Sequence, residues 1–217
     1  MTQIFVFGAS TAYGVGGRSG GWPDLLKQRL HEEMYALSQL PPEKHEIYNL
    51  CVPGATVADV KERLAIELKS YAKPGRQQIV TIELGGNDAK AIETPSNYTN
   101  TPEVFVQELK ELVDIAKMHA EHILLVGLQP VDETKTAPRT NPWTERKVYF
   151  TNQRMNLFEE SIADLAQKEN ITYIPIFAEA SKLNWEKEYL FEDGLHPNEK
   201  GHQWLYEKVY SAIKKLL

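Results

Sequence analysis

The chain has 217 residues, of which 42% are hydrophobic and 25% charged, as in an ordinary globular domain. Its formal net charge of -6, from 24 basic and 30 acidic residues, argues against a nucleic-acid partner, because binding to phosphates needs a basic face. No stretch approaches the roughly 18 apolar residues of a membrane span, and the one cysteine, Cys51, excludes an intramolecular disulfide.

The first eight residues are typical of a strand and carry neither the basic leader nor the cleavage site of a signal peptide. We therefore expect a cytoplasmic protein. No linker rich in Gly, Ser or Pro separates two halves of the chain, so the sequence predicts a single domain over residues 1–217.

Short apolar runs alternate with longer segments of helical periodicity. Continuously apolar runs are typical of strands buried on both faces of a parallel sheet. The predicted strands are Ile4–Phe7, Glu46–Cys51, Gln78–Leu84, His122–Leu128 and Thr172–Phe177. The predicted helices are Trp22–Leu37, Thr56–Tyr71, Pro102–His119, Thr144–Glu169 and Asn198–Leu217. This alternation predicts an α/β protein, a three-layer α/β/α sandwich around a five-stranded, mostly parallel sheet, with one long loop at Gln129–Trp143.

Four segments with unusual local sequence follow the first three predicted strands or precede the last predicted helix, and the end of the fourth strand opens the Gln129 loop. Sites in open α/β sheets gather at the carboxyl ends of the strands. The four segments are Gly8-Ala9-Ser10-Thr11, the stretch ending at Gly54, Gly85-Gly86-Asn87-Asp88, and Asp193-Gly194-Leu195-His196-Pro197-Asn198.

Each segment alone has a simpler explanation. Gly8–Gly14 is compatible with a tight turn or a distant relative of a phosphate-binding loop, although it matches neither G-x-G-x-x-G nor the P-loop pattern. Asn87 is a residue type common in turns. His196 directly precedes Pro197 and Asn198, which are typical of the start of a helix. Their coincidence at ends that the predicted fold brings together favours a shared site.

Together the four segments resemble, in order and over nearly the whole chain, the four blocks of the SGNH hydrolases, also called the GDSL esterase and lipase family. The resemblance implies the flavodoxin-like sandwich of that family and activity on esters, a class that includes short acyl esters, lysophospholipids, thioesters and acetylated sugars. The chain departs from the family pattern at Ala9, where the usual residue is Asp. This departure concerns the support of the serine loop and the specificity subgroup rather than the nucleophile.

The residue types suit acyl transfer. A serine hydroxyl such as that of Ser10 needs a base to take its proton, and histidine, here His196, is the side chain that most often serves as that base. Asp193, three residues earlier on the same loop, is placed to accept from the other ring nitrogen. Ser10 is not framed by G-x-S-x-G, so the nucleophile elbow of the α/β-hydrolases does not fit.

The resemblance also implies an oxyanion hole made by the Ser10 backbone, the Gly54 backbone and the Asn87 side chain. A glycine at position 54 lets a backbone N–H approach a substrate without a Cβ in the way. Pocket-shaping loops are expected at Gly14–Trp22 and Gln129–Trp143. The candidate substrate contacts are Tyr13, Asp88, Arg139 and Trp143, and Asp88 is equally suited to holding its turn.

We therefore expect a serine esterase that hydrolyses a small acyl or acetyl ester through an acyl-enzyme, with a small molecule as its partner. No cofactor is expected, and no metal, since H-E-x-x-H, paired cysteines and acidic calcium loops are missing from the sequence. Two alternatives stay open. One is a non-catalytic binding module of the same fold; the other is a nucleotide- or phosphosugar-binding enzyme that uses Gly8–Gly17, with Arg18 as the nearby cation.

Overall fold

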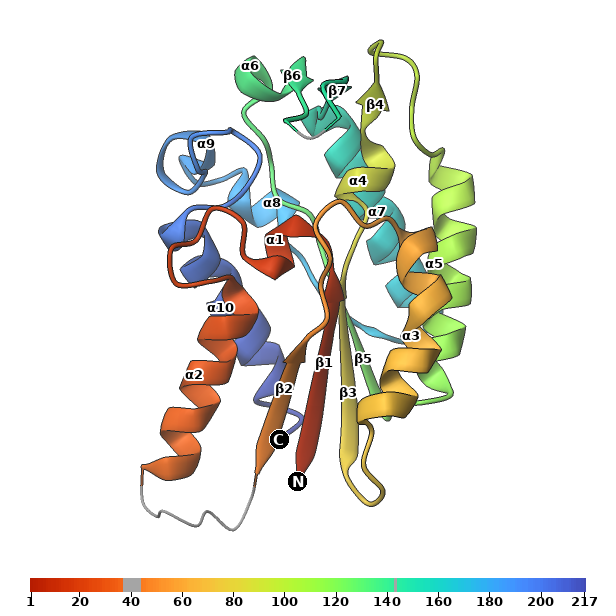
Figure 1. Ribbon diagram of the computed structural model, residues 1–217, viewed down its shortest axis with the longest axis vertical. Coiled ribbons are helices and arrows are strands. Elements are labelled where there is room, and N and C mark those ends of the chain that lie inside the picture. The colour runs from red at the N-terminus through yellow and green to blue at the C-terminus, as the bar shows by residue number, and fades with distance from the viewer. Residues whose placement is uncertain (37–43, 143) are drawn as a thin grey trace.

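The computed structural model describes residues 1–36, 44–142 and 144–217. A five-stranded sheet runs through its centre in the order β2-β1-β3-β5-β8, with every neighbouring pair parallel (Figure 1). The strands are β1 (Thr2–Gly8), β2 (His45–Asn49), β3 (Gln77–Glu83), β5 (His122–Val126) and β8 (Thr172–Ile174). The predicted α/β/α sandwich and its five-stranded sheet are confirmed.

Helices cover both faces of the sheet, because successive side chains of a strand point to opposite sides. Phe5 and Phe7 of β1 pack in one core cluster with residues of α3 (Val57–Tyr71), α5 (Pro102–Lys117) and α7 (Asn152–Lys168). Ile4 and Val6 belong to the other cluster, with α2 (Trp22–Tyr35) and α10 (Glu199–Ile213). Figure 1 shows these two layers on either side of the strands. In the part of the chain that the structure describes, no helix combines the length and apolarity needed to cross a bilayer.

Several helices begin at a residue whose side chain accepts a hydrogen bond from the first turn. Thr56 accepts a hydrogen bond from the backbone of Asp59, whose carboxylate accepts in return from Thr56, as in a capping box. Thr101 caps α5 as expected, with Pro102 in the first turn, where its missing N–H costs nothing.

The main departure from prediction lies between β5 and α7. Residues 144–151, expected to be helical, instead contain β7 (Lys147–Tyr149), and α7 begins only after its cap, Thr151. The β-branched and aromatic side chains of Val148 and Tyr149 favour a strand. Paired antiparallel with β4 (Ala91–Ile92) and β6 (Arg139–Thr140), β7 forms a small second sheet, order β4-β7-β6. This sheet lies over the carboxyl ends of the main strands (Figure 1).

Other differences concern short elements. The expected loop Gln129–Trp143 contains β6 and the one-turn helix α6 (Glu133–Thr136), and Trp143 lies outside the described residues. Phe177, predicted in a strand, begins a helix, and the predicted end of α2 at Leu37 also lies outside the described residues. The remaining one-turn helices are α1 (Ser10–Tyr13), α4 (Gly86–Ala89), α8 (Phe177–Ala180) and α9 (Trp185–Glu188). Four residues are too few to display a helical period, so the sequence did not predict them.

A buried carboxylate from α7 fixes the carboxyl ends of β5 and β8. Glu159 accepts four hydrogen bonds at 2.6–2.9 Å, from the Tyr173 hydroxyl and from the backbone N–H groups of Leu128, Ile176 and Phe177. Gly127 lies directly against it, since a Cβ at this position would be 2.6 Å from the carboxylate. Residue 127 is therefore a glycine because the carboxylate needs the space.

Replacing this carboxylate tests its contribution. In Glu159→Gln an NH₂ group replaces one of the two carboxylate oxygens. Because this NH₂ cannot accept, at least one buried backbone N–H loses its partner. We expect the free energy of unfolding, measured by urea denaturation, to fall by about 1–3 kcal/mol. Glu160→Gln, on the exposed side of the same helix, is the matched control and should change it by less than about 0.5 kcal/mol. Equal stability of the two variants would contradict this role.

Candidate active site

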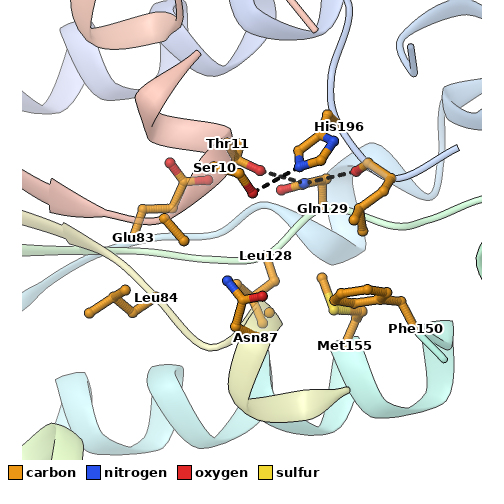
Figure 2. Close-up of a pocket in the computed structure, with 13 residues that line it drawn as sticks. Ser10, Thr11, Glu83, Leu84, Asn87, Leu128, Gln129, Phe150, Met155 and His196 are labelled. Atoms are coloured by element: carbon orange, nitrogen blue, oxygen red, sulfur yellow. Dashed lines mark hydrogen bonds between the residues drawn. The ribbon is translucent and has the colours of Figure 1, made fainter. Parts of the chain in front are cut away.

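The chain brings Ser10 and His196 together from opposite ends of the sequence. Ser10 begins α1 directly after β1, and His196 lies on the loop before α10. The Ser10 Oγ is 2.8 Å from the His196 Nε2, although the residues are 186 positions apart. Figure 2 shows this hydrogen bond at the edge of a pocket. The expected convergence of these two segments is confirmed.

Asp193 orients the imidazole from the same loop. Its Oδ2 is 2.6 Å from the His196 Nδ1, while its Oδ1 accepts from the backbone N–H groups of Leu195 and His196, both at 3.0 Å. An ionised carboxylate only accepts, so Nδ1 carries the hydrogen and Nε2 is left as an acceptor facing the Ser10 hydroxyl. Burial alone would raise the pKa of Asp193, but the bonds from His196 and the two backbone groups hold that pKa well below its usual range.

Arg139 reaches the same carboxylate from the small sheet. Its Nη1 lies 3.1 Å from the Asp193 Oδ2, and both side chains are mostly buried. As predicted, Arg139 lies on the wall of a cavity beside Ser10, but its guanidinium is also engaged with Asp193. Sequence reasoning missed this ion pair because the two residues are 54 positions apart and their elements were not predicted to meet.

The backbone N–H groups of Gly54 and of Ser10 itself are available to a ligand. Val52–Ala55 form a turn closed by a 3.1 Å bond from Ala55 N to Val52 O, with Pro53 second and Gly54 third at φ +88°. This is the geometry of a type II turn, whose third position requires a positive φ and therefore favours glycine. Neither the Gly54 N–H nor the Ser10 N–H donates a hydrogen bond within residues 1–36, 44–142 and 144–217.

Asn87 follows β3 on α4 and lies below Ser10 in Figure 2. The Nδ2 donates to the carbonyl of Ala55 at 3.1 Å, and the Oδ1 accepts from the Lys90 Nζ at 3.1 Å. Asn87 thus contacts the carbonyl next to Gly54. The three residues predicted to form an oxyanion hole all line the larger cavity.

Two cavities open at Ser10 and share Asn87 and His196 among their lining residues. The larger, of about 370 Å³, lies between the ends of the main strands and the small sheet, with Gly54, Lys90 and Arg139 in its wall. The smaller, of about 40 Å³, has a mostly apolar lining that includes Leu84, Leu128, Phe150 and Met155. Figure 2 shows Leu128, Phe150 and Met155 closing it below Ser10.

Gln129 connects the serine segment to the histidine loop. Its side chain is only 4% exposed, and its Nε2 donates both to the Thr11 Oγ1 at 3.1 Å and to the Leu195 carbonyl at 3.3 Å. The one sequence signal was its position at a predicted strand end. Its two partners could not be inferred from the sequence.

Two predicted substrate contacts are not found in these cavities. Tyr13 is 54% exposed and lines neither of them. Asp88 is 1% exposed and points away from both, since its Oδ1 accepts from the backbone N–H of Val57 in the first turn of α3 at 3.3 Å. Burial raises the pKa of Asp88 to about 6. Its place is therefore structural, and the predicted contact at Trp143 lies outside the described residues.

The geometry gives little support to the phosphate-binding alternative. The segment from Gly8 to Gly17 contains helix α1 with Ser10. The Arg18 side chain is 92% exposed, pairs with Glu199 and lines neither cavity. Among the described residues, no group of three or more His, Cys, Asp or Glu side chains is placed to hold a metal ion.

A second carboxyl group lies beside Ser10 without touching His196. Glu83, the last residue of β3, lines the smaller cavity and is buried. Its Oε2 accepts from the Trp22 Nε1 at 2.6 Å. Burial raises the pKa of Glu83 to about 8, and the single bond from Trp22 only partly opposes this rise. Burial therefore favours the protonated form of Glu83.

Comparison with known proteins shows the family to which the chain belongs. The model of the GDSL-like Lipase/Acylhydrolase family matches residues 6–204. The GDSL esterase/lipase CPRD49 of Arabidopsis thaliana is 23% identical, over 98% of this chain and 79% of that protein. A lipase/acylhydrolase from Enterococcus faecalis has a similar structure, with a TM-score of 0.74 and 20% identity over 100% of this chain and 97% of that one. A catalytic mutant of Axe2, an acetylxylan esterase from Geobacillus stearothermophilus, also has a similar structure, with a TM-score of 0.71 and 16% identity over 98% of this chain and 94% of that one.

The Glu83 carboxyl makes stability depend on pH. Between about pH 4.5, its ordinary pKa, and about pH 8, the folded protein keeps a proton that the unfolded chain has lost. Glu83 therefore makes the unfolding free energy fall by about 1.4 kcal/mol per pH unit in this window. Glu83→Gln keeps an acceptor for Trp22 but does not titrate. We expect it to gain stability over the wild type as pH rises from 5 to 8, measured by urea denaturation at each pH.

The matched control for this prediction is Glu62→Gln, at an exposed position of α3. Its stability should follow that of the wild type across the pH range. If the difference between Glu83→Gln and the wild type were the same at pH 5 and pH 8, Glu83 would have to be ionised in the folded protein throughout.

Proposed function

Because the chain belongs to the GDSL-like lipase/acylhydrolase family, we propose that it is a serine esterase that cleaves a small acyl or acetyl ester through an acyl-enzyme. The observation that carries this proposal is the continuous chain of contacts from the Ser10 Oγ to the His196 Nε2 at 2.8 Å and from the His196 Nδ1 to the Asp193 Oδ2 at 2.6 Å. A hydroxyl, a base and an orienting carboxylate in this order make an activated nucleophile.

In the first half of the proposed reaction, the Ser10 Oγ attacks the ester carbonyl carbon while His196 Nε2 takes the hydroxyl proton. Asp193 stabilises the resulting imidazolium. The carbonyl oxygen becomes an anion, which the N–H groups of Ser10, Gly54 and the Asn87 amide are placed to bind. When the intermediate collapses, the alcohol leaves with the proton from His196 and the acyl group stays on Ser10.

In the second half, a water molecule attacks the acyl carbon while His196 takes one of its protons. The same three donors bind the second oxyanion. Collapse then breaks the bond to the Ser10 Oγ, which recovers its proton from His196, and the carboxylic acid leaves. Apart from the ester and one water molecule, these steps use only the residues named above.

The unequal cavities support a short acyl group. The smaller cavity, of about 40 Å³, has room for only a few water-sized groups, which suits an acetyl or similar chain. The larger one, of about 370 Å³, can take a bulkier alcohol. The acetylxylan esterase of similar fold is named for the removal of such an acyl group. We therefore assign the acyl side to the smaller cavity and the alcohol side to the larger.

Removal of the nucleophile tests the reaction. The wild type is expected to hydrolyse p-nitrophenyl acetate and to react with a fluorophosphonate probe, whereas Ser10→Ala should do neither. His196→Ala should lose as much turnover as Ser10→Ala, because a coupled pair fails as a unit. The matched control is Ser161→Ala, at a half-buried position of α7 that lines neither cavity, which should keep wild-type turnover. Hydrolysis by Ser10→Ala would remove this assignment, and a wild type without turnover but stabilised by a nucleotide would favour the binding alternative.

Enlarging the smaller cavity tests the acyl assignment. Met155 is buried in its wall, so Met155→Ala makes room for a longer chain, whereas Met155→Leu roughly conserves volume. Across p-nitrophenyl acetate, butyrate and octanoate, the wild type and Met155→Leu should prefer acetate. Met155→Ala should shift the preference in kcat/KM toward butyrate by about tenfold, the effect of one or two methylenes in an apolar pocket. An unchanged chain-length profile would place the acyl group elsewhere.

A further inference from the structure

Lys90 makes a contact that the proposed chemistry does not explain. It follows α4, lies half-buried in the wall of the larger cavity, and donates from Nζ to the Asn87 Oδ1 at 3.1 Å. Within the described part of the chain no carboxylate lies within ion-pair distance of this ammonium, and Asp88 and Asp59 act on it only from farther away. A half-buried cation whose direct partner is a neutral amide is unusual, because burial disfavours a charge that is not closely paired. Burial correspondingly lowers the pKa of Lys90.

The two contacts of Asn87 together determine which way its amide faces. The Lys90 ammonium can only donate, and the Ala55 carbonyl can only accept. The Oδ1 must therefore face Lys90 and the Nδ2 must face Ala55, as observed. One N–H of the Nδ2 is used by Ala55, and the other is left for the cavity that Asn87 shares with Ser10.

We propose that Lys90 is a positioning residue, which holds the Asn87 amide so that its second N–H faces the developing oxyanion. This inference rests on the proposed esterase function. Without Lys90, the amide is held by the Ala55 carbonyl alone and can rotate about its terminal torsion, which is broad for asparagine. The charge adds to the effect, because a hydrogen bond from a cation polarises the amide and strengthens the bond that its own N–H donates.

The same ammonium has two further hydrogens that can reach a ligand in the larger cavity. If these bound an anionic group of the substrate, Lys90 would act directly and its effect would appear in KM. As a positioning residue it acts through Asn87, and its effect appears in kcat and vanishes when the Asn87 amide is absent. The two roles are therefore separable by a double-mutant cycle.

The experiment compares Lys90→Met, Lys90→Arg, Asn87→Ala and the double variant Lys90→Met/Asn87→Ala with p-nitrophenyl acetate, a neutral ester. Asn87→Ala should lower kcat by about 10²–10³, the usual effect of losing an oxyanion donor. Lys90→Met should lower kcat by about tenfold with little change in KM, and Lys90→Arg, which keeps a charged donor, should recover most of it. In the Asn87→Ala background, Lys90→Met should lower kcat by less than about twofold.

Lys27→Met, at an exposed position of α2, is the matched control and should match the wild type. A loss from Lys90→Met that is equal in both Asn87 backgrounds would overturn the proposal. So would a selective rise in KM for an ester with an anionic alcohol group, the side of the substrate assigned to the larger cavity, because it would indicate direct substrate binding. If Ser10→Ala abolishes turnover while Lys90→Met does not affect it, positioning fails and the esterase function stands.

A measurement without turnover completes the test. In a crystal structure of Lys90→Met, the Asn87 amide should rotate away from the Ala55 carbonyl or occupy more than one orientation, while the thermal midpoint stays close to that of the wild type. If the amide keeps its wild-type orientation in that variant, Lys90 does not position it, whatever the kinetics show.

Discussion

The contact on which the rest of the site depends is the 2.8 Å hydrogen bond between Ser10 and His196. It joins the turn after the first strand to the loop before the last helix, so it exists only if the whole sheet is assembled in the right order. The order β2-β1-β3-β5-β8 places β1 between β2 and β3, and these strand ends carry Gly54 and Asn87. Gln129 then fixes the serine segment against the histidine loop through Thr11 and Leu195.

The groups around this bond are held by partners outside the reacting set. Asp193 is fixed by two backbone N–H groups and by Arg139 of the small sheet, and the Asn87 amide is fixed by Lys90 and the Ala55 carbonyl. Such support matters because donors aimed in advance at a developing charge need no reorganisation during the reaction. The small sheet also forms a wall of the larger cavity, so the same element supports the proposed catalytic carboxylate and shapes the proposed alcohol site.

Periodicity and composition predicted the main sheet and its layers, because these depend on long buried runs. The convergence of Ser10, Asp193 and His196 was predicted from the position of their segments at the ends of elements, together with the resemblance to the SGNH hydrolases. The small sheet was missed, since its strands have two or three residues each and pair across long distances in the chain. For the same reason Arg139 was predicted on the pocket wall without its bond to Asp193. Tyr13 and Asp88 follow Ser10 and Asn87 closely in the sequence, which made them candidate contacts. The sequence does not show that the Tyr13 side chain is exposed or that Asp88 accepts from the first turn of α3.

The central claim is that the Ser10 hydroxyl becomes covalently acylated with the help of His196. Rapid quenching of the wild type with p-nitrophenyl acetate, followed by peptide mass spectrometry, tests it most directly. The account predicts an acetyl group on the peptide that contains Ser10, located on Ser10 and not on Thr11, and its loss in His196→Ala. Turnover without any acyl adduct, or an adduct on another residue, would contradict the claim.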